Sequence, residues 1–268
     1  MRDFEGKVVA ITGGATGIGF SFAKRFGGEG AKIVIGGPRK DRLREAVTAL
    51  TEAGIEAKHR KCDVTKKREV EALADFAWRA FGHVDVIVNN AGISLPQNPV
   101  VDTPEADIHR IFAVNFYGVW NGVAIFGKRL IEQGTPAAIY NVGSENSLFN
   151  GVPMSAAYVA SKHAVLAITE ALREELPGFI EVGLICPGFV RSELGPPEMM
   201  VRGMDTDKFT TLAMEQIKNG EFFIVSHPYN IVRINDRHAE ISRAYERYAP
   251  RYEGDDEFDV RTLVQTRL

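Results

Sequence analysis

Cysteine is scarce in this sequence, with only Cys62 and Cys186 among 268 residues. Two isolated thiols give neither a disulfide framework nor the spacing of a zinc site, so we expect a reducing compartment and no bound metal. Long apolar runs are also absent: no stretch approaches the roughly 18 apolar residues that span a membrane. Residues 1–6 carry no apolar signal region. We therefore expect a soluble cytoplasmic protein with no membrane partner.

An excess of charge of either sign is missing as well. The chain has 32 Lys and Arg against 35 Asp and Glu, and no basic run is longer than residues 66–68. This excludes the basic footprint typical of a nucleic-acid-binding protein. The chain does contain 45% hydrophobic residues, which at this length is enough for one large α/β core.

Apolar strands alternate with amphipathic helices along the chain. This order predicts a parallel sheet with helices on both faces, a Rossmann-type doubly wound α/β fold. No linker divides residues 1–268, so we expect a single domain. The expected strands are 7–12, 32–35, 57–61, 84–88, 137–142, 180–185 and 221–225, and the expected helices are 20–26, 41–52, 66–81, 104–131, 155–176 and 228–248.

The turn after the first strand is rich in glycine. Residues 12–19 read T-G-G-A-T-G-I-G between a buried strand and a helix. Glycine permits a tight turn and close approach of a pyrophosphate, and the free N–H groups at a helix start favour negative charge. The turn therefore predicts dinucleotide phosphate binding by Gly13, Ala15, Thr16, Gly17, Ile18 and Gly19.

Tyr158 and Lys162 are one turn apart on a predicted helix, so they share a face. A free phenol with a pKa of about 10 is a poor acid at neutral pH, but a fixed cation nearby favours phenolate. Ser144 follows the predicted strand 137–142, at the sheet edge where parallel sheets bind ligands. Ser147 is a competing hydroxyl further past the strand. A Tyr/Lys pair at this spacing and a serine after a strand are each common on their own. Their interpretation as catalytic residues therefore depends on the glycine turn.

These motifs resemble the short-chain dehydrogenase/reductase family when they are taken together with the N-N-A-G turn at 89–92, Asn115 and the Pro187-Gly188 pair. The resemblance runs in the family's order over about residues 6–192, the expected cofactor-binding and catalytic core. It implies hydride transfer between NAD(P) and a secondary alcohol or ketone. It also implies a homodimer or homotetramer, formed through the helices that carry Asn115 and Tyr158.

The same resemblance implies a role for each of four residues. Tyr158 exchanges a proton with the substrate oxygen, and Ser144 hydrogen-bonds that oxygen. Lys162 lowers the pKa of the phenol and binds the nicotinamide ribose. Asn115 anchors a water that leads to the lysine; an asparagine within a helix lowers helix propensity, which favours a functional reason for it.

Further cofactor contacts are implied for five positions. Asp63 and Val64 match the family's adenine contact, although Asp63 also fits a cap for the next helix. Asn90 lies in the turn that approaches the cofactor. Val190 and Ser192 belong to a P-G-x-x-x-T-like segment that meets the nicotinamide carboxamide, with serine in place of threonine.

The choice of cofactor depends on the end of the second strand. An acid there selects NAD, whereas a nearby arginine accommodates the extra phosphate of NADP. Gly37 stands at the acid position, and Arg39 and Lys40 follow Pro38. We therefore expect NADP, with NAD as the alternative; Arg39 and Lys40 also fit a solvated turn.

The segment after Ser192 is rich in Gly, Pro and Met, which suits a mobile lid, so we assign residues 193–220 to a substrate lid. Residues 221–268 are expected to form the last strand, a helix and a tail. This part resembles bacterial aryl-alcohol dehydrogenases that act on lignin-derived compounds and suggests a small-molecule substrate that is bulky and hydrophobic or aromatic. Candidate pocket residues are Phe149, Met154, Phe189, Leu194, Met199 and Met200.

Two other functions fit parts of the pattern. A ketoreductase of 3-ketoacyl or polyketide type is an alternative within the family, and it would need a basic docking patch near the lid. Only Arg191, Arg202 and Lys208 are candidates for such a patch. A non-catalytic dinucleotide sensor is more remote, because the tyrosine and the lysine are both present.

Overall fold

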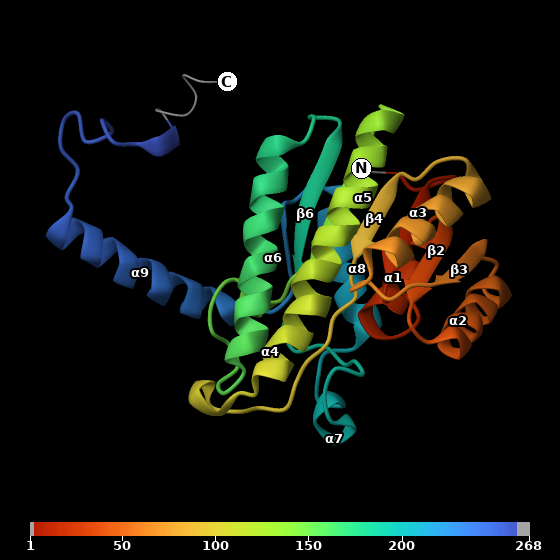
Figure 1. Ribbon diagram of the computed structural model, residues 1–268, viewed down its shortest axis with the longest axis horizontal. Coiled ribbons are helices and arrows are strands. Elements are labelled where there is room, and N and C mark those ends of the chain that lie inside the picture. Colours follow the sequence, from red (N-terminus) through yellow and green to blue (C-terminus); the bar gives the residue numbers. More distant parts are fainter. Residues whose placement is uncertain (1–2, 262–268) are drawn as a thin grey trace. The chain divides into compact units, whose positions relative to one another are not determined.

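A computed structural model describes residues 3–261. Seven parallel strands form one sheet in the order β3-β2-β1-β4-β5-β6-β7 (Figure 1). This confirms the Rossmann-type α/β fold. The strands are β1 (Val8–Thr12), β2 (Lys32–Gly37), β3 (Ala57–Lys61), β4 (Val86–Asn89), β5 (Ala137–Val142), β6 (Ile180–Cys186) and β7 (Phe223–Val225).

The sheet places a binding crevice at one edge. The strand order reverses between β1 and β4, so the chain leaves these neighbouring strands in opposite directions across the sheet. The carboxyl ends of the strands on either side of such a switch point leave a crevice that binds ligands. The glycine turn follows β1 and the N-N-A-G turn follows β4, so both motifs lie at this crevice.

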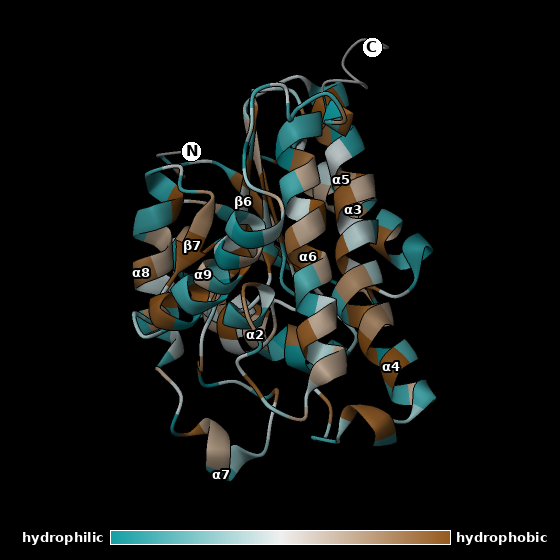
Figure 2. Cartoon of the chain, turned by 90° about the vertical axis from the view of Figure 1, so that its left-hand side faces the viewer, coloured by the Kyte–Doolittle hydropathy of each residue, from teal (hydrophilic) through white to brown (hydrophobic). Residues whose placement is uncertain are grey.

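Helices cover both faces of the sheet. The first face packs against α1 (Gly17–Gly28), α2 (Lys40–Glu52) and α8 (Thr206–Lys218). The second face packs against α3 (Lys67–Phe81), α5 (Gly118–Gln133) and α6 (Ala156–Glu175). Helices α5 and α6 run side by side in Figure 2, and Figure 1 shows α3 on the other side of α5. Strands that are buried on both faces have nearly continuous apolar sequences, as in β1, where all five residues are buried.

The helix expected over residues 104–131 is not uniform. It consists of α4 (Glu105–Phe112), a π-helical turn η2 (Ala113–Tyr117) and then α5. A π-turn widens the helix by one residue and is frequent at functional sites. Over five residues, hydrophobic periodicity does not distinguish a π-turn from a regular α-helix, so the sequence predicted one continuous helix.

The segment expected to form a lid contains a core helix. Helix α8 buries Phe209, Ala213 and Ile217 against α1 and the sheet, and Asp205 caps its start by accepting from two backbone N–H groups. The lid assignment over 193–220 is therefore narrowed to residues 193–205. These include the short helix α7 (Pro197–Met200), which projects beyond the carboxyl ends of the strands (Figure 1). A lid role for residues 193–205 stays a prediction.

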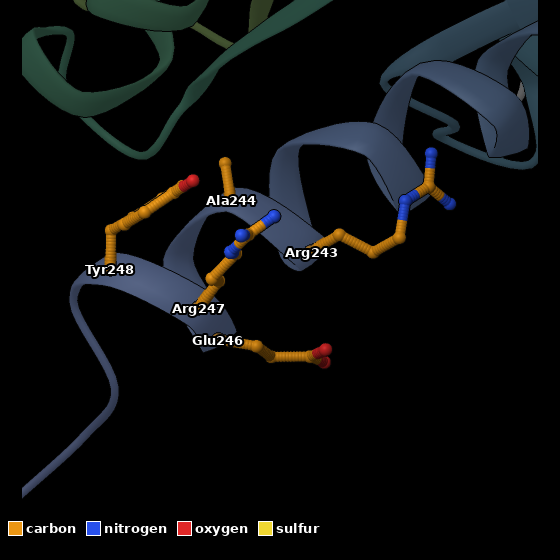
Figure 3. Close-up of a pocket in the computed structure, with 5 residues that line it drawn as sticks. All are labelled: Arg243, Ala244, Glu246, Arg247 and Tyr248. Atoms are coloured by element: carbon orange, nitrogen blue, oxygen red, sulfur yellow. The ribbon is translucent and has the colours of Figure 1, made fainter.

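Within the described part of the chain, residues 3–227 and residues 228–261 form separate compact units. The second unit contains α9 (Asn230–Tyr248), whose side chains are largely exposed. Figure 3 shows a hollow on its surface beside Arg243, Ala244, Glu246, Arg247 and Tyr248. All five come from one stretch of a single helix, so the hollow is an open helix surface. None of the helices within residues 3–261 is both long and apolar enough to span a membrane.

Candidate active site

The glycine turn has the shape of a phosphate cradle. Gly13 and Gly17 have φ values of +64° and +56°, a region that favours glycine. A Cβ on Gly19 would overlap the Asn90 amide and the Gly13 carbonyl oxygen. Helix α1 begins at Gly17 with no side-chain cap at Thr16, so its first N–H groups face the turn without a side-chain acceptor at the cap position.

Asn90 supports this turn from the next strand. Its Nδ2 donates to the carbonyl oxygens of Thr12 and Gly13 at 2.9 and 3.1 Å. In return, Thr12 Oγ1 accepts from the backbone N–H groups of Asn90 and Ala91. The structure therefore shows Asn90 holding the two turns of the crevice together. Thr12, which the sequence did not single out, completes that link.

The two candidate serines have different surroundings. Ser147 Oγ donates to the Lys162 carbonyl oxygen at 2.7 Å and accepts from the Ser144 N–H at 3.2 Å, so its hydroxyl is engaged by backbone. Ser144 shares a side-chain hydrogen bond with Tyr158. Ser144 also opens the short 3-10 helix η3 (Glu145–Ser147) and accepts from the Asn146 N–H. Of the two hydroxyls, only that of Ser144 meets the tyrosine.

Helix α6 places Tyr158 and Lys162 on one face. Lys162 Nζ lies 5.8 Å from the centre of the Tyr158 ring and donates to the Val142 carbonyl oxygen at 2.9 Å. Only 5% of Lys162 is exposed. Burial lowers the pKa of Lys162 to about 8, because it disfavours the charged ammonium.

The pKa of Tyr158 differs from the expectation that Lys162 lowers it. Burial raises this pKa, the hydrogen bond from Ser144 opposes the rise, and the negative charge of Glu145 adds to it. The ammonium of Lys162 is turned toward Val142, which limits its effect on the phenol. The phenol is therefore protonated at neutral pH.

Asn115 lies in the π-turn and is fully buried. Its Oδ1 accepts from the Ile93 N–H at 2.8 Å, and its Nδ2 donates to the Ile93 carbonyl oxygen at 3.0 Å. A Cβ on Gly92 would lie 3.4 Å from Asn115 Oδ1 and 3.6 Å from Lys162 Nζ. The asparagine and the lysine thus face the same glycine, which leaves a small space between them.

The adenosine end shows an unexpected partner for Arg39. Its guanidinium pairs with the Glu193 carboxylate at 2.7 Å, and both side chains are about half exposed. Gly37, the last residue of β2, pairs in register with Lys61, the last residue of β3, so Lys61 is a second basic residue at the carboxyl edge of the sheet. A carboxylate at position 193 gives no local signal in the sequence, because the pair joins residues 154 positions apart.

Asp63 and Val64 are both held by local contacts. Asp63 Oδ1 accepts from the Thr65 N–H and hydroxyl at 3.1 and 2.8 Å. Burial opposes ionisation, but these hydrogen bonds and Lys66 hold the pKa of Asp63 below its usual value. The Val64 carbonyl oxygen accepts from Asn121 at 2.9 Å. The carboxylate thus supports the turn before α3, and its adenine contact stays a prediction.

Ser192 lies over the glycine turn. Its Cβ would be 3.5 Å from a Cβ on Gly17, and its Oγ accepts from the Leu194 N–H. Val190 is buried and bridges to Met204. Among the candidate pocket residues, Met154 lines a small cleft together with Tyr158, whereas Phe149 and Met200 are buried.

The residues present fit a dinucleotide. The glycine cradle lies at the switch point, and Ser192 faces the cradle. Ser144 follows β5, and its side chain meets Tyr158, which lies with Lys162 near the start of α6. This fold and site define a class of dinucleotide-dependent oxidoreductases.

Comparison with known proteins identifies the family. Residues 7–199 match the family described as short chain dehydrogenase, and the chain belongs to it. A relative, 1-deoxy-11-beta-hydroxypentalenate dehydrogenase from Streptomyces exfoliatus, is 31% identical over 245 residues, which cover 88% of this chain and 89% of the relative.

Two solved structures are similar over nearly the whole chain. A short chain dehydrogenase/reductase from Burkholderia phymatum, in complex with NAD, is 30% identical with a TM-score of 0.85; the match covers 91% of this chain and 97% of that one. The apo form of LigO from Sphingobium sp. strain SYK-6 is 27% identical with a TM-score of 0.85, covering 100% and 99%.

Proposed function

We propose that this oxidoreductase interconverts a bulky, hydrophobic or aromatic secondary alcohol and its ketone, with NADP as the preferred cofactor. The hydrogen bond between Ser144 and Tyr158, at the carboxyl edge of the sheet, is the observation that supports this best. The relatives that act on hydroxylated compounds and the aryl-alcohol dehydrogenase resemblance of the C-terminal part support the substrate class.

The bound cofactor supplies or accepts a hydride. Tyr158 donates its proton to the carbonyl oxygen during reduction and accepts it back during oxidation. Ser144 donates a hydrogen bond to the same oxygen and stabilises the charge that develops there. Lys162, which donates to the Val142 carbonyl oxygen, would bind the ribose, and Asn115, which faces the same glycine, would hold a water for proton return.

The preference for NADP is supported by the end of β2. Gly37 offers no carboxylate to repel a phosphate, while Arg39 follows two residues later and Lys61 lies in register. Glu193 competes for Arg39, so a phosphate would have to displace an exposed carboxylate. Such exposed pairs contribute only about 0–1 kcal/mol, which keeps Arg39 accessible.

An oligomer, formed through the helices that carry Asn115 and Tyr158, stays a prediction. Two aromatic side chains support it: Tyr117, at the end of the π-turn, is 58% exposed, and Trp120, on the following turn of α5, is 52% exposed.

The proposed function is tested with a panel of aryl and aliphatic secondary alcohols and ketones, each with NADPH/NADP and NADH/NAD, followed by absorbance of the reduced nicotinamide. We expect turnover to be greatest for bulky aryl substrates with NADP. Tyr158→Phe keeps the ring but removes the proton, so kcat should fall by about 10²–10⁴-fold. A folded Tyr158→Phe variant with near-normal kcat would disprove the mechanism.

A further inference from the structure

The ion pair between Arg39 and Glu193 joins two segments that flank the glycine turn. Arg39 follows β2, which pairs with β1, the strand that leads into the turn. Glu193 follows Ser192, whose Cβ would be 3.5 Å from a Cβ placed on Gly17. The guanidinium and the carboxylate therefore meet at 2.7 Å beside the phosphate cradle, and the carboxylate comes from the segment expected to form a lid.

Arg39 differs from two other arginines of α2 in the origin of its partner. Arg42 pairs with Glu45 at 3.1 Å. Arg44 pairs with Asp41, so both of these arginines find a carboxylate within the helix. The carboxylate that meets Arg39 lies 154 positions further along the chain. The lid segment therefore brings a negative charge to the arginine that is expected to accommodate the extra phosphate of NADP.

The end of β2 indicates what this charge does to cofactor binding. In dinucleotide folds, an acid at this position binds the ribose hydroxyls and selects NAD. Gly37 provides no acid there, whereas Glu193 brings a carboxylate to the same edge from a distant segment. The two side chains of the ion pair are 54% and 50% exposed, so the pair can open when another anion binds. A carboxylate and a phosphate that meet one guanidinium also repel each other.

We propose that Glu193 is a specificity-determining residue for the cofactor: its carboxylate competes with the 2′-phosphate of NADP for Arg39 and lowers the preference for NADP over NAD. The inference rests on the proposed function, in which Arg39 accommodates that phosphate. NAD carries no phosphate at this position, so it does not compete with Glu193 for the guanidinium. Glu193 therefore limits a preference that Gly37 and Arg39 create.

The test is isothermal titration calorimetry of NADP and of NAD with the full chain, without substrate. Glu193→Gln keeps the size of the side chain and removes its charge. We expect the Kd for NADP to fall by about 5–10-fold, because the competition for Arg39 and the repulsion of the phosphate are both removed. The Kd for NAD should stay within about twofold of the wild type, since an exposed ion pair contributes little by itself.

Ionic strength separates an electrostatic effect from a change in the shape of the site. The Debye length is about 10 Å at 0.1 M salt and about 3 Å at 1 M salt. At 1 M salt, the Kd for NADP of Glu193→Gln should therefore lie within about twofold of the wild type measured at the same salt concentration. A substitution that only reshapes the loop would keep its effect at both salt concentrations.

Two control variants test where the charge acts. Glu198→Gln removes the same charge from an exposed position on α7, in the same segment, and should leave both Kd values unchanged. In an Arg39→Gln background, Glu193 has no guanidinium to compete for. Glu193→Gln should then improve NADP binding by less than it does in the wild-type background, which a double-mutant cycle measures.

Three results would overturn the inference: an unchanged ratio of the two Kd values in Glu193→Gln, an equal gain in Glu198→Gln, or an equal gain in the Arg39→Gln background. The calorimetry needs no substrate, so it is separate from the test of turnover. A wild type that turns over no secondary alcohol, or that binds NAD more tightly than NADP, contradicts the proposed function even if Glu193→Gln shifts the ratio toward NADP. An active wild type that prefers NADP, with an unshifted ratio in Glu193→Gln, refutes only the role of Glu193.

Discussion

Replacing each of the two neighbouring serines by alanine should separate catalysis from stability. Ser147→Ala removes a donor to the Lys162 carbonyl oxygen and leaves the buried N–H of Ser144 without its acceptor. The carbonyl has a second lone pair, so the unsatisfied N–H dominates the effect. We expect a loss of about 2 kcal/mol in the free energy of unfolding, since one unsatisfied buried group costs about 1–3 kcal/mol.

Ser144→Ala should differ from Ser147→Ala in its effect on catalysis. It removes the hydroxyl that meets Tyr158 but leaves the bond between Ser147 and the Lys162 backbone in place. We expect kcat to fall by about 10²–10³-fold, as for the loss of one donor to a developing oxyanion. The loss of stability should be similar to that of Ser147→Ala, about 1–3 kcal/mol, because the buried N–H of Asn146 loses its acceptor.

Urea and thermal unfolding at pH 7, together with steady-state kinetics on the same samples, measure both effects. Ser147→Ala should lower Tm by about 5 °C, the shift expected for this loss in a chain of such size, with kcat within about threefold of wild type. The exposed Ser242→Ala is the matched control and should change stability by less than about 0.5 kcal/mol. The reasoning is refuted if Ser147→Ala abolishes turnover while Ser144→Ala keeps it.

Two further substitutions test the cofactor end and the buried lysine. Gly37→Asp adds a carboxylate where a Cβ would meet only Leu43 at 3.7 Å, so repulsion of the extra phosphate should weaken NADP binding by about 10–100-fold. The control Gly178→Asp, at a position in open space, should leave the Kd values for NADP and NAD unchanged. A Kd for NADP in Gly37→Asp equal to that of the wild type would count against the assignment. Lys162 has its pKa lowered to about 8, so charging it opposes folding fully below pH 8, and the penalty fades between pH 8 and about 10.5. Lys162→Met should therefore have a free energy of unfolding about 1–2 kcal/mol higher at pH 7, once the loss of the hydrogen bond to Val142 is subtracted, although the variant should be inactive. This gain in stability should vanish near pH 10.5. A Lys162→Met variant that is less stable than the wild type at pH 7 would contradict the reasoning.

The fold and the central site were largely predictable because their signals are local. A buried strand, a glycine turn and a helix start follow one another within residues 8–28, and a parallel sheet brings the strand ends together. Ser144 and Asn115 therefore reach Tyr158 and Lys162 from separate segments, as the resemblance implied.

What the sequence did not predict depends on non-local contacts or on weak signals. The pair of Arg39 and Glu193 joins distant exposed residues, and nothing in either segment indicates the other. The π-turn keeps the hydrophobic pattern of a helix. Helix α8, by contrast, had a usable signal: Asp205 as a cap followed by Phe209, Ala213 and Ile217 at helical spacing. The glycine and proline content just before it concealed this pattern.

The proton of the Tyr158 phenol shows where the sequence-based expectation and the structure differ. The sequence alone suggested that a nearby cation would lower the pKa of Tyr158, but burial raises this pKa and the negative charge of Glu145 adds to the rise. A protonated phenol is ready to reduce a ketone at neutral pH, whereas alcohol oxidation needs phenolate and gains as pH rises. In the proposed function, the pKa of Tyr158 therefore decides at which pH reduction and oxidation each have the phenol in the required form.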